Sequence, residues 1–243
     1  MKPSVSFAVL LSLFAFSPLH SQTGPSPYPE SETDWPGRGP IRTFPYMTDN
    51  RNGFWQNRTQ DQGAVVLVGD SLVAGAKKWE PLQNAFPGLL IVDRGIGGDT
   101  SRGTLFRFQE DVLDLHPKAI VILVGSNDLS AHGKPDDTVA NLAEMVAMAR
   151  AQDPELPVII CTIPPRNHPK APTQPGKQDE LNEKIKGLAE DKTVILDIHP
   201  MFLKEDGTQD PQYFAADLLH LTPPAYVKLS EELKKAFAEL KIE

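Results

Sequence analysis

The chain has 243 residues, of which 40% are apolar and 23% charged, the balance of an ordinary globular domain that is long enough to bury a core. Its 24 lysines and arginines are outnumbered by 32 aspartates and glutamates, which gives a net charge of -8. Binding of nucleic acid requires clustered basic side chains that neutralise phosphates, so nucleic acid is excluded as an expected partner.

The first 21 residues have the order of a secretory signal peptide. A lysine near the start is followed by a mostly apolar run at residues 5–16, then by Pro18 and by small residues around Ser21. The run is shorter than the roughly 20 residues that span a membrane, and an uncleaved anchor is the alternative. We therefore expect a secreted or periplasmic protein without a membrane span after cleavage. Cys161, the only cysteine, lies in an apolar run and is interpreted as a buried hydrophobe.

Residues 22–62 form a Pro-rich lead-in arm. The segment is rich in proline, glycine, aspartate and asparagine and shows no helical or strand period, which predicts an extended conformation. It also holds large apolar side chains, among them Trp35, Phe44 and Trp55, which are too many for a solvated tail. Part of the arm is therefore expected to pack against the single main domain at residues 63–243.

Short apolar runs alternate with amphipathic stretches in the main domain. Five runs are too short for helices and are predicted strands, at residues 64–68, 89–93, 119–124, 158–163 and 193–197. Helices are expected between them, for instance at residues 139–151, and a last helix begins near Pro223. Continuous apolar strands that alternate with helices predict an α/β fold with a five-stranded parallel sheet buried on both faces.

Polar and glycine-rich clusters follow the first three predicted strands. They are Gly69-Asp70-Ser71, Gly95-Ile96-Gly97-Gly98-Asp99 and Gly125-Ser126-Asn127-Asp128. A parallel sheet places its ligand site at the carboxyl ends of its strands, so these clusters are expected to meet there. Ser71 would lie between a strand and a helix N-terminus, where backbone N–H groups stabilise a developing anion and favour a nucleophile. The alternative is that Asp70 or Ser71 merely caps that helix.

Gly98 and Asn127 are candidate donors to an oxyanion. Without a Cβ atom, Gly98 lets a substrate approach its backbone N–H, and the Asn127 amide follows an apolar strand from which it can reach the same oxygen. The alternatives are a tight turn with Asp99 as a helix cap and an ordinary turn-forming asparagine. The glycines from Gly95 onward lack the dinucleotide-binding spacing, and no Gly-Lys-Ser/Thr follows them, so no nucleotide cofactor is predicted.

Asp217 and His220 lie three residues apart just before the last predicted helix. One short turn could hold both, so that His220 takes the proton of Ser71 while Asp217 fixes its tautomer and stabilises the imidazolium. An isolated Asp-His pair is more often structural. The other five histidines fall in the signal region, near a helix end or in loops, and none has a metal-ligand spacing, so no metal is expected.

These residues resemble the four sequence blocks of the SGNH (GDSL-type) hydrolase family. Ser71 stands in Gly-Asp-Ser-Leu, Gly98 in Gly-Ile-Gly-Gly-Asp, Asn127 in Gly-Ser-Asn-Asp and His220 in Asp-Leu-Leu-His-Leu, in the family's order. The resemblance implies a flavodoxin-like three-layer α/β/α fold and a serine esterase with Ser71, Asp217 and His220 as catalytic residues. It also implies an oxyanion hole formed by the N–H groups of Ser71 and Gly98 and by the Asn127 amide, with no required cofactor.

Two stretches resemble one subgroup of that family, which is related to platelet-activating-factor acetylhydrolase and to exported bacterial carbohydrate acetylesterases. They are Gly95-Ile96-Gly97-Gly98-Asp99-Thr100 and Ile163-Pro164-Pro165-Arg166, within a resemblance that covers residues 54–240. That subgroup favours short acyl groups. Two positions depart from the pattern, because Asp93 stands where many relatives have Asn and Pro224-Ala225 replaces the usual residue-Gly before Tyr226.

Arg166 is a candidate substrate-binding residue. It follows the fourth predicted strand, and the Pro164-Pro165 step is expected to carry its side chain beyond the carboxyl edge of the sheet. There its fork of donors could bind a sugar hydroxyl or a carboxylate. The alternative is a surface salt bridge.

The leading hypothesis is therefore an exported esterase that removes acetyl or other short acyl groups from a carbohydrate or a similar alcohol. Its expected partner is a small-molecule or glycan ester. A lysophospholipase or thioesterase is the alternative enzyme and would need an apolar acyl channel. A noncatalytic glycan-binding module on the same fold is the alternative outside catalysis.

Overall fold

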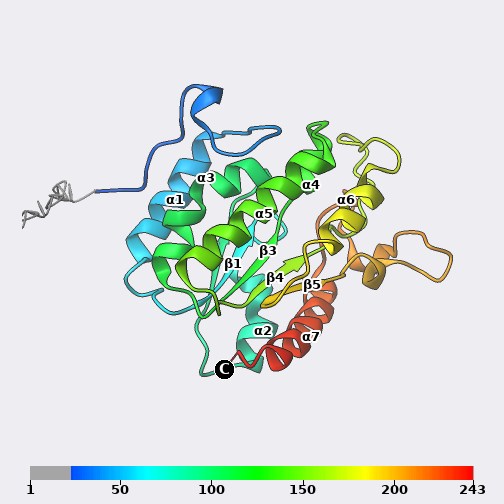
Figure 1. Cartoon of the computed structure of the whole chain (residues 1–243). Helices are drawn as coiled ribbons and strands as arrows, with labels where there is room; N and C mark the ends of the chain where they lie inside the picture. The colour runs from blue at the N-terminus through cyan, green and yellow to red at the C-terminus, as the bar shows by residue number, and fades with distance from the viewer. Residues whose placement is uncertain (1–22, 243) are drawn as a thin grey trace, which may run out of the picture.

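The computed structural model describes residues 23–242 and is organised around a five-stranded parallel sheet with the strand order β2-β1-β3-β4-β5 (Figure 1). The bounds of the strands are Val65–Gly69 for β1, Ile91–Gly95 for β2, Ala119–Leu123 for β3, Val158–Cys161 for β4 and Thr193–Leu196 for β5. The strands expected from the five apolar runs are confirmed with small shifts of their ends. The predicted signal peptide at residues 1–21 lies outside the described residues.

The burial of the strands explains their sequence pattern. Every residue of β1, β3 and β4 is buried, because these central strands have helices on both faces, whereas the edge strands β2 and β5 are partly exposed. In the register of the sheet, Gly69 at the end of β1 pairs with Gly95 of β2 and with Leu123 of β3. The three polar clusters therefore leave the sheet side by side at its carboxyl edge.

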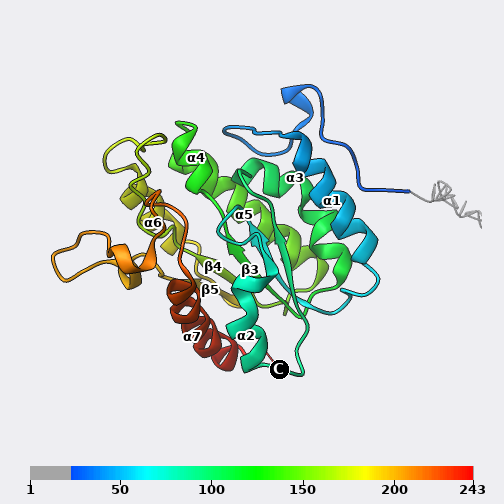
Figure 2. The ribbon, with the colours of Figure 1, turned by 180° about the vertical axis from the view of Figure 1, so that it is seen from behind.

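Helices cover both faces of the sheet. On one face lie α1 (Pro45–Asn57), α3 (Ser101–Asp111), α5 (Pro135–Gln152) and α6 (Lys177–Lys186), with α3 against α5 and α5 against α6 (Figure 1). On the other face, α2 (Glu80–Ala85) packs against α7 (Pro223–Glu239) (Figure 2). The expected three-layer α/β/α fold is confirmed.

Short helical segments complete the architecture. They are α4 (Ser126–Ser130) and the 3-10 helices η1 (Glu32–Asp34), η2 (Ala76–Trp79), η3 (Leu113–Leu115), η4 (Pro200–Phe202) and η5 (Pro211–Tyr213). Among residues 23–242, no helix combines the length and the apolar character that a membrane crossing requires.

The lead-in arm is not extended throughout, and that expectation is wrong for its second half. Residues Pro45–Asn57 form α1, with Pro45 in the first turn, where its fixed φ angle is compatible with a helix. The helix buries only Met47 and Arg51. A helix that buries one apolar and one charged side chain leaves no apolar period in its sequence, which is why the pattern did not reveal it.

The first half of the arm packs against α3. The Tyr28 and Trp35 rings stack with their centroids 5.4 Å apart, and the Trp35 ring lies 5.1 Å from that of Phe106 in α3. Further along the arm, the Pro40 carbonyl oxygen accepts a hydrogen bond of 2.9 Å from Thr100 Oγ1 at the N-cap of α3. The arm thus reaches the carboxyl edge of the sheet, where the candidate site residues lie.

Candidate active site

Ser71 lies in a tight turn that follows β1. A Cβ atom at Gly69 would lie only 1.9 Å from the Leu123 carbonyl oxygen, so glycine is needed for the close approach of β1 and β3 at this point. The turn is closed by the Ala74 N–H, which donates to the Asp70 carbonyl oxygen at 3.0 Å. This geometry places Ser71 at the first exposed step beyond the sheet.

The helix expected directly after Ser71 is replaced by this single turn, and η2 begins only at Ala76. Gly75, with φ at +116°, separates the two and breaks any continuous helix. The expected contribution of a long helix N-terminus to the nucleophile is therefore wrong, and the N–H groups available here belong to the turn itself.

The structure brings Ser71, His220 and Asp217 into one hydrogen-bonded line. His220 Nε2 lies 2.9 Å from Ser71 Oγ, and His220 Nδ1 lies 2.6 Å from Asp217 Oδ2. The other Asp217 oxygen, Oδ1, accepts from the backbone N–H groups of Leu219 at 3.1 Å and His220 at 3.0 Å. Leu218 completes the turn in the left-handed region with φ at +56°. A spacing of three residues thus places the acid beneath the imidazole.

The charge of Asp217 sets the tautomer of His220. Partial burial acts to raise the pKa of Asp217, but the hydrogen bonds from the His220 side chain and from the His220 and Leu219 N–H groups outweigh it and lower the pKa to about 2. The carboxylate is therefore ionised at neutral pH and holds a proton on Nδ1. The His220 Nε2 atom is left as an acceptor for the Ser71 hydroxyl, the arrangement that a general base requires.

Gly98 and Asn127 lie beside this line on the neighbouring loops. Gly98 has φ at +80°, in the turn between β2 and α3, and Asn127 lies in α4 after β3. The Asn127 Nδ2 donates to the Asp99 carbonyl oxygen at 2.9 Å and, in a weaker contact, to Asp70 Oδ2 at 3.3 Å. The Asn127 amide therefore joins the loops that follow β1, β2 and β3. Its more weakly held N–H is the one that contacts Asp70 in the turn of Ser71.

Three buried carboxyl groups hold these loops in place. Burial raises the pKa of Asp70 to about 7, against the lowering effect of the Leu72 N–H, which donates to Asp70 Oδ1 at 2.9 Å. Asp99 is paired with Arg107 at 2.8 Å. Asp128 accepts from the Ser101 hydroxyl at 2.6 Å, so it braces the α4 loop and takes no part in the hydrogen-bonded line.

Asp93, one of the two departures from the family pattern, ties the nucleophile loop to the Gly98 loop. Its Oδ1 accepts from the Gly95 N–H at 2.7 Å and its Oδ2 from the Gly75 N–H at 2.5 Å. Burial raises the pKa of this carboxyl, while these two hydrogen bonds lower it. An asparagine at this position has only one oxygen, so the aspartate makes one more contact of this kind than the amide could.

Arg166 reaches Ser126, which follows the carboxyl end of β3, but its side chain is buried instead of being open to a substrate. Its side chain is 5% exposed, and Nη1 donates to the carbonyl oxygen of Ser126 and, at 3.2 Å, to Ser126 Oγ. Nη2 donates to the Ala171 carbonyl oxygen at 2.8 Å. The burial also excludes a surface salt bridge. Arg166 thus contacts Ser126, the first residue of α4, and can position the segment that carries Asn127.

Two residues at the site have no signal in the sequence. Arg42 of the arm donates from Nη1 to Asn127 Oδ1 at 3.1 Å, across 85 positions of the chain. Lys78 donates from Nζ to the Ser71 carbonyl oxygen at 2.7 Å. Neither residue belongs to a motif, and only the packing of the arm and of η2 brings them to the edge.

Metal binding and thiol chemistry are the remaining kinds of reactivity to consider. In the part of the chain that the structure describes, no three histidine, cysteine, aspartate or glutamate side chains are grouped so that they could hold a metal ion. Cys161 is buried in β4, and burial raises the pKa of its thiol to about 12, so it stays a neutral thiol.

The profile of the GDSL-like Lipase/Acylhydrolase family matches residues 67–228 of this chain. The chain belongs to this family. The match runs from β1 into α7, so it includes the turn of Ser71 and the Asp217-His220 turn. This acylhydrolase is an ester hydrolase, and the noncatalytic glycan-binding alternative is set aside.

Several known proteins resemble this acylhydrolase. It is 28% identical over 225 residues to platelet-activating factor acetylhydrolase IB subunit alpha2 from Gallus gallus, a match that covers 91% of this chain and 93% of the relative. A GDSL-like lipase from Bacteroides thetaiotaomicron superposes with a TM-score of 0.65 at 27% identity, over 76% of this chain and 97% of that one. An acetyl-xylooligosaccharide esterase from Geobacillus Stearmophilus, at 21% identity and a TM-score of 0.60, covers 74% of this chain and 95% of its own and shares the fold.

Proposed function

We propose that this acylhydrolase is an exported serine esterase that removes acetyl or other short acyl groups from carbohydrates or similar alcohols through an acyl-enzyme on Ser71. The observation that carries the proposal is the line from Ser71 Oγ to His220 Nε2 at 2.9 Å and from His220 Nδ1 to Asp217 at 2.6 Å. A serine hydroxyl bonded to an imidazole that an ionised carboxylate orients is the arrangement of an activated nucleophile.

The acylation step follows from this geometry. Ser71 Oγ forms a bond to the ester carbonyl carbon while its proton passes to His220 Nε2, and the Asp217 carboxylate stabilises the imidazolium. The negative charge on the former carbonyl oxygen is met by the N–H groups of Ser71 and Gly98 and by the Asn127 amide, whose 3.3 Å contact with Asp70 is the weaker of its two and the easier to exchange.

Deacylation uses the same groups in reverse. Acylation ends when the first oxyanion collapses and the bond from the acyl carbon to the alcohol oxygen breaks, while His220 gives its proton to that oxygen and the alcohol leaves. In deacylation, His220 Nε2 accepts a proton from a water molecule whose oxygen bonds to the acyl carbon. Collapse of the second oxyanion breaks the bond to Ser71 Oγ, releases the carboxylic acid and returns the proton to the serine. Apart from the attacking water, the proton balance uses only Ser71 and His220.

Three features support the finer parts of the proposal. The curated relatives are named acetylhydrolases, which supports a short acyl group. The lysine, apolar run and small residues at positions 1–21 support export. The resemblance of the segments around Gly98 and Arg166 to carbohydrate acetylesterases, on a fold that an acetyl-xylooligosaccharide esterase shares, supports a sugar ester as the substrate.

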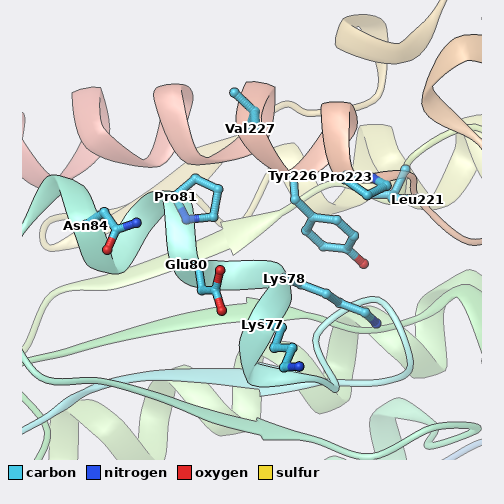
Figure 3. Close-up of a pocket in the computed structure, with 9 residues that line it drawn as sticks. All are labelled: Lys77, Lys78, Glu80, Pro81, Asn84, Leu221, Pro223, Tyr226 and Val227. Atoms are coloured by element: carbon cyan, nitrogen blue, oxygen red, sulfur yellow. The ribbon is translucent and has the colours of Figure 1, made fainter.

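One structural feature favours the alternative, an enzyme for longer acyl chains such as a lysophospholipase or thioesterase. A groove of about 640 Å³ runs between α2 and α7 (Figure 3). Lys78 and Tyr226 lie toward the same end of it as Leu221, while Pro81 and Asn84 lie toward the other end. Lys78 contacts the Ser71 backbone at 2.7 Å, so this end of the groove adjoins the nucleophile loop. An acyl chain could lie in the groove.

Three measurements test the proposal. A fluorophosphonate probe should label the wild-type protein and not Ser71→Ala, and labelling that persists with esterase activity in the variant would show that another nucleophile acts. With p-nitrophenyl esters of increasing chain length, kcat/KM should fall steeply beyond about four carbons. The long-chain alternative would be favoured if kcat/KM rose with chain length in the wild type and this rise were lost in Val227→Trp, a change at a residue that lines the groove. Acetate release from a panel of acetylated glycans tests the alcohol part.

A further inference from the structure

Two aromatic side chains of the arm are exposed at the carboxyl edge of the sheet. The Phe44 and Tyr46 rings are stacked, with centroids 5.5 Å apart and an interplanar angle of 10°, and the two residues are 42% and 46% exposed. Single exposed apolar residues are common on protein surfaces, but adjoining aromatic rings at the edge of a reactive site form a contact surface. Their position relative to Ser71 therefore decides what they can bind.

The aromatic pair lies against the backbone that we assign to the oxyanion hole. A Cβ atom at Gly98 would lie 3.0 Å from Phe44 Cε2 and 3.2 Å from Tyr46 Oη. The Tyr46 hydroxyl also donates to the Gly97 carbonyl oxygen at 3.0 Å. A substrate whose carbonyl oxygen is held by the Gly98 N–H therefore has these two rings within reach.

Arg42 adds hydrogen-bond donors to the same wall of the site. Its guanidinium is half-buried and donates to Asn127 Oδ1 and to Ser130 Oγ, both at 3.1 Å. Within residues 23–242 it forms no ion pair, so its charge is met only by these neutral oxygens. A guanidinium has five N–H donors, and those not used here are available to a polar group of a ligand.

We propose that Phe44, Tyr46 and Arg42 form the subsite for the sugar ring of the ester. The C–H face of a pyranose would lie on the aromatic pair, whose electron-rich ring faces attract its weakly positive hydrogens, and a ring hydroxyl would accept from Arg42. The inference rests on the proposed function, because with an acetyl group on Ser71 only the alcohol part of the substrate is large enough to reach these side chains. The arm thus determines which alcohol is accepted.

The test compares a sugar ester with an ester too small to reach the arm. Acetate release from acetylated xylo-oligosaccharides and from ethyl acetate is measured for the wild type, Phe44→Ala, Tyr46→Phe and Leu90→Ala. Leu90 is a matched control, because it is 43% exposed but lies just before β2, at the opposite edge of the sheet. Thermal unfolding of each variant shows whether the fold is kept.

For Phe44→Ala we expect KM for the sugar ester to rise about tenfold, and the ratio of kcat/KM for the sugar ester to that for ethyl acetate to fall by a similar factor. Tyr46→Phe keeps the ring and should keep the ratio, which separates stacking from the hydrogen bond to Gly97. Leu90→Ala should match the wild type. Calorimetric binding of the sugar ester to Ser71→Ala with and without Phe44→Ala should show the same tenfold weakening without turnover.

The possible failures are distinguishable. If Phe44→Ala loses the same factor on both esters, or loses nothing on the sugar ester that the wild type cleaves, the subsite is overturned while the proposed function stands. If the wild type cleaves ethyl acetate but releases no acetate from any acetylated sugar, the carbohydrate part of the proposed function fails, and the subsite fails with it.

Discussion

Replacing Asp217 with asparagine is the sharpest test of the line from Ser71 to Asp217. The side-chain oxygen of asparagine keeps one acceptor of the carboxylate, while its NH2 group replaces the other acceptor with a donor. The side-chain oxygen of asparagine can still accept from the backbone N–H groups of Leu219 and His220, which Asp217 Oδ1 accepts at 3.1 and 3.0 Å. Its NH2 group, however, replaces the Oδ2 that accepts from His220 Nδ1 at 2.6 Å. The turn should keep its shape, while the imidazole loses its acceptor and the negative charge.

The expected loss follows from the exposure of this pair. In a buried serine triad the corresponding change lowers kcat by about 10,000-fold. Here the side chains of His220 and Asp217 are 43% and 34% exposed, so water screens the charge and can partly replace the acceptor. We therefore expect kcat/KM to fall by about 100- to 1,000-fold, equivalent to about 3 to 4 kcal/mol of transition-state stabilisation.

The assay is steady-state hydrolysis of p-nitrophenyl acetate together with urea unfolding. Asp217→Asn should change the free energy of unfolding by less than about 1 kcal/mol, because the backbone contacts of the turn are kept. Asp210→Asn is the control, since the Asp210 carboxylate likewise accepts a backbone N–H, from Gln212 at 3.1 Å, and carries the same charge. Activity within a few-fold of the wild type in Asp217→Asn would refute the assigned role, and an equal loss in Asp210→Asn would attribute it to charge alone.

Two further predictions concern pH. Because His220 Nε2 must be unprotonated to accept the Ser71 proton, kcat/KM should fall about tenfold per pH unit on its acid limb, and a flat profile between about pH 4 and 9 would contradict the assignment. Asp70 has a pKa raised from 3.8 to about 7 by burial, so the folded state holds a proton that the unfolded state has lost. This proton's contribution to the free energy of unfolding is full below about pH 4 and is lost as the pH rises through 7, a decrease of at most about 4 kcal/mol. Urea unfolding at several pH values measures this decrease, and Asp70→Asn should reduce it.

The parts of the fold that could be predicted are those whose sequence signal is local. Central parallel strands buried on both faces must be continuous apolar runs, so β1, β3 and β4 were visible in the sequence. The helix α1 was not, because a helix that buries only Met47 and Arg51 leaves no period to detect. Side-chain direction was also hidden: a Pro-Pro step sets the backbone before Arg166, but only the packing of α4 decides that its guanidinium turns inward.

The residues of the candidate site can likewise be separated into those with a local sequence signal and those without one. Ser71 and the Asp217-His220 pair depend on a strand end and on a three-residue spacing, both of which are written in consecutive residues. The contact of Arg42 with Asn127 joins residues 85 positions apart and depends on the packing of an arm with no motif. Sequence motifs therefore locate the candidate catalytic residues, whereas the residues that surround them come from segments whose position only tertiary structure defines.

The lead-in arm is joined to the catalytic loops by buried charges as well as by aromatic packing. Arg51 of α1 and Arg107 of α3 both contact Asp111, at 3.4 and 3.3 Å, and Arg107 also pairs with Asp99 at 2.8 Å. The carbonyl oxygen of Asp99 in turn accepts from the Asn127 amide.

Charges removed from water are stable only while each keeps its partner, and removing one member of such a set costs about 3 to 5 kcal/mol. The arm cannot separate from α3 without leaving Asp111 short of a cation. The ion pairs at Asp99 and Asp111, next to the Gly98 loop, therefore include a residue from outside the family's motifs. The arm is in this sense a structural part of the candidate site, because Arg51 pairs with Asp111, which shares Arg107 with Asp99.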